Sequence, residues 1–254
     1  MERNKTEIFE TANILRTVMD AGSFASDLGK AAVERLQVSL NPLKYKMEWN
    51  YFRTFANRSG VVMVPGIGAT PRLDFKLLEE GLNTVHHFPV YPEMGFNFLT
   101  PNEAEKKIME AVKKAQDKSG DKAVLAGHSY GGVQSIIFAG RHPEELKGLI
   151  TIATPTAVIE GKIGLNAFIT IPLMGIIRRT ENAEQLINEY LHSDVKVPWL
   201  SVSVPGDKIV DQRACLARGK IRKTIEVEGS HAGMGSNPEA VNQILHYLTR
   251  WPAL

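Results

Sequence analysis

A pentapeptide in the middle of the chain has the residue types and spacing of a serine nucleophile. Residues 127–131 read Gly-His-Ser-Tyr-Gly, which fits the pattern G-x-S-x-G. An apolar run (123–126) precedes them, and a helical pattern (133–139) follows. In such a strand-to-helix turn the serine hydroxyl stands clear at the strand end, and passing chain leaves room only for glycine two residues to either side. The pattern favours nucleophilic chemistry at Ser129.

A serine hydroxyl is a poor nucleophile at neutral pH and needs a base within hydrogen-bond reach. His231 is the histidine best placed to be that base, because it lies in a loop directly after a late predicted strand (221–227). The other six histidines lie in a predicted strand (His86, His87), beside the serine with a side chain expected to point away from it (His128), or in later segments (His142, His192, His246).

The base in turn needs an acid that fixes its tautomer and stabilises the imidazolium. Asp207 comes directly after the predicted strand 198–204, and Asp211 is a competitor four residues later. Position at a strand end favours Asp207, whereas Asp211 is expected to cap a short helix. The order is then Ser, Asp, His, unlike the orders of chymotrypsin and subtilisin.

Attack on a carbonyl also calls for hydrogen-bond donors that hold the oxyanion. One donor is expected to be the backbone N–H of Tyr130, the residue after the nucleophile. The second is expected in the loop 65–68, Pro-Gly-Ile-Gly, where two glycines let the backbone turn inward and expose the N–H of Ile67. The alternative interpretation of this loop is a tight turn without a catalytic use.

These residues are positioned by short apolar strands that alternate with amphipathic helices. This alternation predicts an α/β protein with a mostly parallel sheet. Ser129, Asp207, His231 and the loop 65–68 all follow strand ends, where ligands bind on such sheets. The predicted strands are 61–64, 84–89, 123–126, 148–152, 198–204 and 221–227, and the predicted helices are 72–80 with Gly81 as cap, 101–118, 133–139, 183–191, 213–218 and 238–249.

Residues 1–59 stand apart as a helical N-terminal extension. Apolar residues recur there at helical spacing in two groups, one of Ile8, Ala12, Leu15 and Met19 and one of Val33, Leu36 and Leu40. The first interpretation is an extension that packs on the main domain. The second is an interface for a partner or a lipid surface, which the mixed charges of the segment disfavour.

Composition narrows the function classes. The chain has 254 residues, 43% hydrophobic and 23% charged, with a net charge of +2, so no strong field argues for a nucleic acid partner. The lone Cys215 excludes an internal disulfide and is expected to be a small buried hydrophobe. The first ten residues lack an apolar run and no later run spans a membrane, so we expect a cytoplasmic protein without membrane insertion. No metal-spaced cluster or phosphate loop occurs, so we expect no metal and no cofactor.

From residue 60 to the end, the chain resembles the α/β-hydrolase superfamily, and within it the small bacterial lipase and esterase branch. Four segments carry the resemblance: an oxyanion strand and loop (62–68), a nucleophile elbow (127–132), an acid loop whose aspartate falls on Asp207 (206–215) and a histidine loop (229–234). Two features depart from the family pattern. Pro65 replaces the histidine that many lipases have, and a helical segment replaces the usual opening hairpin.

The resemblance implies an α/β-hydrolase fold of about six strands in a catalytic domain (60–254), with a cap inserted at about 156–196. The segment 163–177 of this cap is apolar, which suggests a hydrophobic acyl group in a small-molecule ester substrate. The implied activity is hydrolysis of carboxylic esters through an acyl-enzyme. A thioesterase, acyltransferase or amidase on the same three residues remains open, as does a non-catalytic binding protein. The oligomeric state is not predicted.

Overall fold

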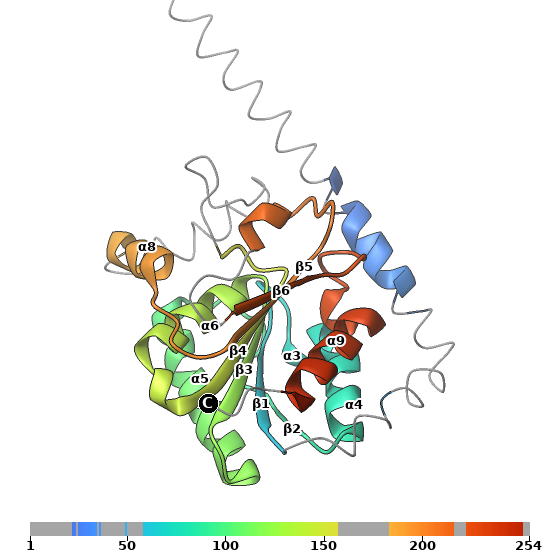
Figure 1. The fold of residues 1–254 in the computed structure, drawn as a ribbon. Helices are drawn as coiled ribbons and strands as arrows, with labels where there is room; N and C mark the ends of the chain where they lie inside the picture. Colours follow the sequence, from blue (N-terminus) through green and yellow to red (C-terminus); the bar gives the residue numbers. More distant parts are fainter. Residues whose placement is uncertain are drawn as a thin grey trace, which may run out of the picture.

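The computed structural model describes residues 22–23, 25–34, 36, 49, 58–156, 183–215 and 222–250. Within these residues, six strands form one sheet in the order β2-β1-β3-β4-β5-β6, and every neighbouring pair is parallel (Figure 1). The strands are β1 (Gly60–Val64), β2 (Phe88–Val90), β3 (Ala123–His128), β4 (Leu146–Ile152), β5 (Trp199–Ser203) and β6 (Arg222–Glu226). The predicted α/β class and parallel sheet are confirmed.

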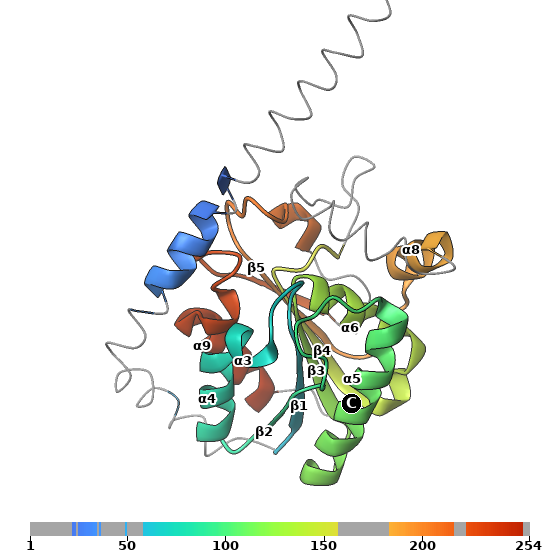
Figure 2. The same ribbon diagram turned by 180° about the vertical axis from the view of Figure 1, so that it is seen from behind.

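Helices cover both faces of the sheet. Figures 1 and 2 show α5, α6 and α8 on one side, and α3, α4 and α9 on the other. The α-helices are α3 (Pro71–Asp74), α4 (Lys76–Thr84), α5 (Pro101–Ser119), α6 (Tyr130–Arg141), α8 (Ala183–His192) and α9 (Pro238–Thr249), and the 3-10 helices are η2 (Pro143–Glu145), η3 (Gln212–Cys215) and η4 (Met234–Ser236). Helix α5 begins as expected at Pro101, behind a capping box of Thr100 and Glu103.

Two hydrophobic cores lie on the two faces of the sheet, because side chains alternate along each strand. In β1, Val62 and Val64 join the core formed with α5 and α6. Val61 and Met63 join the core formed with α4 and α9. The uninterrupted apolar sequence of β1 thus reflects burial on both faces.

The chain changes direction across the sheet at β1, which pairs with both β2 and β3. Val64 at the end of β1 lies opposite Gly127 near the end of β3. The loops that follow these two strands therefore start side by side. In open parallel sheets, ligands bind at this kind of switch point, beyond the carboxyl ends of the strands.

The predicted helix 72–80 is wrong in two respects. It is broken at Phe75 into α3 and α4, and α4 continues past Gly81 to Thr84. Gly81 is a contact between helices instead of a cap, because a Cβ there would lie 3.0 Å from side-chain atoms of both Val241 and Leu245 on α9. Glycine allows α4 and α9 to pack closely.

The predicted strand 84–89 is also corrected, since β2 starts only at Phe88. His86 has φ of 64° and the N–H of His87 donates to Leu82, so both residues belong to the turn that ends α4. Strand β2 lies at the sheet edge, and this position tolerates Pro89, which has no N–H to donate.

The predicted helix 213–218 is described only to Cys215, as part of the 3-10 helix η3. Cys215 is fully buried, and burial raises the pKa of its thiol, as expected for a structural cysteine. Helix α8 confirms the predicted helix 183–191. The apolar part of the predicted cap, 163–177, lies outside the described residues.

In the predicted extension, residues 25–34 are helical, and the first apolar group (Ile8 to Met19) and Leu40 lie outside the described residues. The apolar face predicted from the second group is not buried, because Val33 and Leu36 are 55% and 59% exposed. Ala31 is buried instead, and Trp49 is buried in the core beside α9, where its Nε1 donates to Asn242 at 2.5 Å. These contacts join the extension to the main domain.

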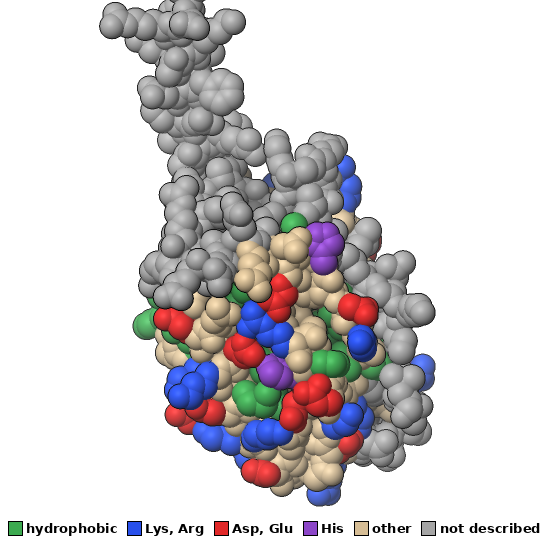
Figure 3. Space-filling model, turned by 90° about the vertical axis from the view of Figure 1, so that its left-hand side faces the viewer, with side chains coloured by type: hydrophobic (Ala, Val, Ile, Leu, Met, Phe, Trp, Pro, Cys, Tyr) green, Lys and Arg blue, Asp and Glu red, His purple; other side chains and the backbone are tan. Residues whose placement is uncertain are grey.

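The described residues were searched for helices that could span a membrane and for groups of side chains that could bind a metal ion. None of the described helices is long and apolar enough to cross a membrane. Among the same residues, no group of three or more His, Cys, Asp or Glu is arranged to hold a metal ion. On the face seen in Figure 3, basic and acidic side chains are interspersed.

Candidate active site

Ser129 lies in a strained turn between β3 and α6. Its φ of 52° and ψ of −118° fall where non-glycine residues are rare, and its N–H donates to Ile152 at 2.9 Å. The flanking glycines are required: a Cβ on Gly127 would lie 2.5 Å from Ser135 Oγ, and one on Gly131 would lie 2.3 Å from the carbonyl oxygen of Val64. The close passage of chain expected from the sequence is therefore present.

The structure brings together the three side chains predicted for the site. The hydroxyl of Ser129 donates to Nε2 of His231 at 3.0 Å. Nδ1 of His231 donates to Oδ2 of Asp207 at 2.8 Å. Ser129 and His231 are each 5% exposed, so the chain of hydrogen bonds is shielded from bulk water.

Asp207 is held in place by its own loop. Its Oδ1 accepts from the N–H of Ile209 at 2.7 Å and of Val210 at 3.1 Å. Burial alone would raise the pKa of Asp207, but the charge and hydrogen bond of His231 and these two N–H groups outweigh it and lower the pKa. The competitor Asp211 accepts from the N–H of Arg213 and pairs with its guanidinium, as expected of a residue that caps η3.

The loop after β1 presents one N–H group that differs from its neighbours. The N–H groups of Gly66, Gly68 and Ala69 donate to Asp74, Asn97 and Gly66 respectively. Among the residues that the structure describes, the N–H of Ile67 has no hydrogen-bond partner. Tyr130 is the first residue of α6, so its N–H lies at a helix N-terminus, where partial positive charge gathers.

Asn97 fixes this loop from the other side and was not predicted. It is fully buried, and its side-chain amide donates to the carbonyl oxygen of Pro65 at 2.7 Å. Its backbone accepts from Gly68 and donates to Ala69, both at 3.0 Å. Asn97 belongs to a long loop between β2 and α5, and nothing in its local sequence pattern signals this contact.

A buried pair, Asp74 and His128, lies under the site and was also missed. Oδ2 of Asp74 accepts from Nδ1 of His128 and from the N–H of Gly66, both at 2.8 Å. Nε2 of His128 donates to the carbonyl oxygen of His231 at 2.9 Å. The pair thus connects the loop after β1, the serine turn and the histidine loop.

The hydrogen bonds of this pair require that the His128 imidazole is positively charged. Both ring nitrogens of His128 face oxygen acceptors, so both carry protons and the imidazole is positive. Burial lowers the pKa of His128, but the carboxylate of Asp74 and the carbonyl of His231 outweigh it and raise the pKa. Burial raises the pKa of Asp74, but the charge and hydrogen bond of His128 and the N–H of Gly66 outweigh it and lower the pKa.

Comparison with known proteins agrees with the observed fold. The family model for the alpha/beta hydrolase fold matches residues 61–169. A search of curated proteins finds no match. Among solved structures, a monoacylglycerol lipase of Paleococcus ferrophilus is 17% identical, with a TM-score of 0.56 over 76% of this chain and 94% of that chain.

Two further solved structures share the fold at similarly low identity. The 2-hydroxy-6-oxo-6-phenylhexa-2,4-dienoate hydrolase of Rhodococcus sp. strain RHA1 is 13% identical, with a TM-score of 0.51 over 76% of this chain and 91% of that chain. The enol-lactonase of Burkholderia xenovorans LB400 is 15% identical, with a TM-score of 0.50 over 76% of this chain and 92% of that chain. The described residues thus have the α/β-hydrolase fold, and residues 61–169 match the model of that family.

Proposed function

We propose that the protein is a serine hydrolase that cleaves carboxylic esters with a hydrophobic acyl part. The observation that carries the proposal is the continuous hydrogen-bond chain from Ser129 through His231 to Asp207. Such a series of hydrogen bonds activates a serine hydroxyl for nucleophilic attack, and a binding protein has no need of it. The monoacylglycerol lipase and the enol-lactonase, as named, act on compounds of the ester class, which supports the same choice.

In the first half of the proposed reaction, Oγ of Ser129 attacks the ester carbonyl carbon. Nε2 of His231 accepts the hydroxyl proton as the new C–O bond forms, and Asp207 stabilises the resulting imidazolium through Nδ1. The backbone N–H groups of Ile67 and Tyr130 donate to the oxyanion. The imidazolium then protonates the leaving oxygen, the alcohol departs, and an acyl-serine remains.

In the second half, water replaces the alcohol. Nε2 of His231 removes a proton from the water as its oxygen attacks the acyl carbon, and the same two N–H groups hold the second oxyanion. Collapse of this intermediate breaks the bond to Oγ of Ser129, which takes the proton back from His231. The carboxylic acid leaves and the enzyme is restored, with no metal or cofactor in any step.

Exposed aromatic side chains beside the loop after β1 support a hydrophobic acyl group. Phe96 and Phe98 are 64% and 52% exposed, although large apolar side chains are normally buried. They flank Asn97, whose backbone pairs with Gly68 and Ala69. Apolar surface therefore adjoins the proposed oxyanion donors, where an acyl chain can be desolvated.

The test is a series of p-nitrophenyl esters from acetate to long-chain acyl groups, with matched thioesters and anilides. We expect hydrolysis of the esters to exceed that of the anilides, and kcat/KM to rise with acyl length by about tenfold for every two buried methylene groups. The Ser129→Ala protein serves as the blank. A folded protein with no activity on any ester, or with faster anilide or thioester turnover, would contradict the proposal.

A further inference from the structure

The N-terminal helix (residues 25–34) presents two carboxylates to the main domain. Asp27, Ala31 and Glu34 are spaced so that they share one face of an α-helix. Asp27 and Ala31 are 8% and 1% exposed, whereas Leu28 and Val33 on other faces are 46% and 55% exposed. The helix therefore buries its acidic face and exposes apolar residues, the reverse of an ordinary amphipathic surface helix.

The buried carboxylates bind the loop that carries His231. The two oxygens of Asp27 accept from the backbone N–H groups of His231 at 2.7 Å and Ala232 at 2.8 Å. The two oxygens of Glu34 accept from the N–H and the hydroxyl of Ser230 at 2.8 and 2.7 Å. Three successive N–H groups thus point at one helix, which is the arrangement that favours an anionic partner.

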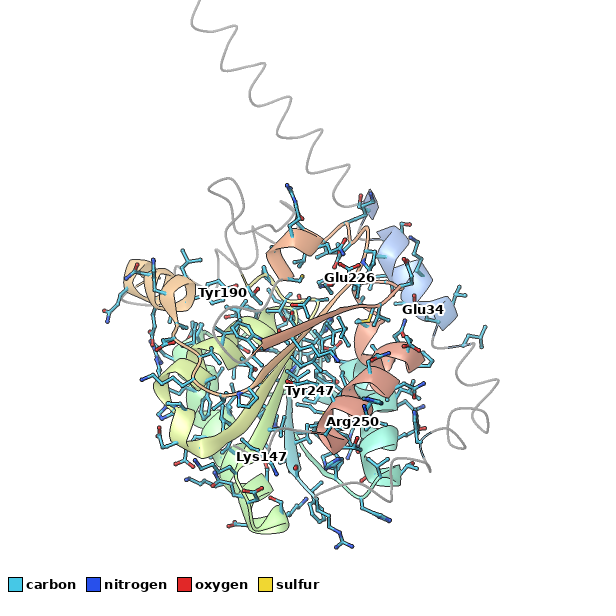
Figure 4. The ribbon with its side chains drawn as sticks, viewed as in Figure 1. Glu34, Lys147, Tyr190, Glu226, Tyr247 and Arg250 are labelled. Carbon is cyan, nitrogen blue, oxygen red and sulfur yellow. The ribbon has the colours of Figure 1, made fainter. Side chains whose placement is uncertain are left out.

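The loop is shaped to receive this helix. A Cβ on Gly233 would lie 2.1 Å from Oε2 of Glu34 and 3.3 Å from Cα of Ala31, so only glycine leaves room for the helix. The N–H of Gly233 donates to the hydroxyl of Ser230, which in turn donates to Glu34. Figures 1 and 4 show the blue helix beside the red C-terminal loops, and Figure 4 labels Glu34 on this helix.

His231 is consequently held through both of its peptide groups. Its N–H donates to Asp27 from the N-terminal helix, and its carbonyl accepts from His128, which is paired with Asp74. We propose that Asp27 and Glu34 are positioning residues for His231, and that the N-terminal helix is part of the active site. The helix lies in the segment 1–59, outside residues 61–169 that the family model matches.

The proposed consequence of this positioning is faster catalysis by Ser129 and His231, and this part of the inference rests on the proposed function. Nε2 of His231 lies 3.0 Å from Oγ of Ser129, and a shift of the loop by about 1 Å would break this hydrogen bond and can cost about 100-fold in rate. The Asp27 carboxylate binds backbone N–H groups of the histidine loop and not the imidazole of His231. Its effect is therefore expected in kcat, with KM nearly unchanged.

The test uses the full chain with isosteric substitutions, Asp27→Asn and Glu34→Gln. An amide keeps the volume but loses the charge and one of the two acceptor oxygens. Asp117→Asn on α5 is the matched control, since that carboxylate is exposed. Lys30→Ala controls for change on the exposed side of the same helix. Hydrogen exchange of the peptide spanning 229–234, kcat and KM are measured for each protein.

We expect Asp27→Asn to speed exchange of the 230–232 amides by at least about tenfold and to lower kcat by about 10- to 100-fold. Glu34→Gln, at a half-buried position, should speed exchange and lower kcat in the same way but by smaller factors. It replaces Asp27→Asn as the test variant if Asp27→Asn does not fold. Exchange and kcat equal to those of Asp117→Asn would overturn the proposal. If the wild-type protein is inactive on every ester but Asp27→Asn still speeds exchange of the loop, the proposed function is contradicted. The role of Asp27 in holding the histidine loop would then still stand.

Discussion

Ser129→Ala and His231→Ala are each expected to lower kcat for ester hydrolysis by about 10⁴- to 10⁶-fold, and the double variant to lower it no further. The reason is that the hydroxyl and the imidazole act as one unit, joined by a 3.0 Å hydrogen bond, so the loss of either leaves the other without a task. Steady-state kinetics on one p-nitrophenyl ester measures all three proteins. Additive losses would show that the two side chains act separately and would contradict the mechanism.

Asp207 and Asp211 provide a matched pair of acid substitutions for the same assay. Asp207→Asn removes the carboxylate that accepts from Nδ1 of His231, and a loss of up to about 10⁴-fold in kcat is expected. Asp211→Asn disturbs only an exposed contact with Arg213 and should leave kcat within about twofold. A larger loss of kcat in Asp211→Asn than in Asp207→Asn would show that Asp207 is not the acid that pairs with His231.

Asp74→Ala is expected to have the largest effect on stability, about 3–5 kcal/mol in the free energy of unfolding. The substitution leaves the buried His128 imidazolium without its counter-charge and the N–H of Gly66 without its acceptor. Both Asp74 and His128 are nearly inaccessible, at 3% and 4% exposure, so water cannot replace the lost partner. Urea-induced unfolding, followed by far-UV circular dichroism, measures the difference.

A surface ion pair of nearly the same length, 2.7 Å against 2.8 Å, is the control. Asp121 lies 2.7 Å from Lys147, yet its side chain is 48% exposed. Asp121→Ala should therefore cost no more than about 1 kcal/mol. An Asp74→Ala protein as stable as the Asp121→Ala protein would show that the buried pair does not hold the site together.

The stability difference between wild type and Asp74→Asn should depend on pH in a defined window. The lowered pKa of Asp74 stabilises the fold above its ordinary value of 3.8, and this stabilisation is lost as the pH falls through the folded pKa. The raised pKa of His128 stabilises the fold below 6.5, and this stabilisation is lost as the pH rises through the folded pKa.

The difference should thus be largest between pH 3.8 and 6.5 and should shrink in alkaline solution, although the nearby charges of His231 and Asp207 also act on the pair. Urea titrations at about pH 5.5 and about pH 9 compare the two regimes. A difference that grows with pH would contradict a charged pair.

Much of the fold and the three central side chains could be predicted because their signals are local. Ser129 lies in a G-x-S-x-G turn, and Asp207 and His231 each follow a strand that reads clearly in the sequence. Parallel strands bring such loops to one edge of the sheet, so order along the chain was enough to place them together. The errors at Gly81 and at β2 concern element ends, which depend on contacts with α9 and on edge position.

The supporting residues could not be predicted, because their partners are distant in sequence. Asp74 and His128 are 54 residues apart, and Asp27 and His231 are 204 apart. Apolar spacing also pointed to the wrong face of the N-terminal helix, since Val33 and Leu36 are exposed while carboxylates are buried. The available signal was the spacing of Asp27 and Glu34, two helical turns apart with Ala31 between them. This spacing indicates a buried acidic face only once the N–H groups of the histidine loop are known to lie against it.

The most direct test of the central claim is reaction with a fluorophosphonate, followed by peptide mass spectrometry. Such a reagent phosphonylates a serine whose hydroxyl is activated by a neighbouring base. We expect one adduct, located on Ser129 in the wild-type protein, and at least about 10³-fold slower labelling in His231→Ala. A wild-type protein that stays unlabelled, or that is labelled on another residue at an equal rate in Ser129→Ala, would contradict that claim.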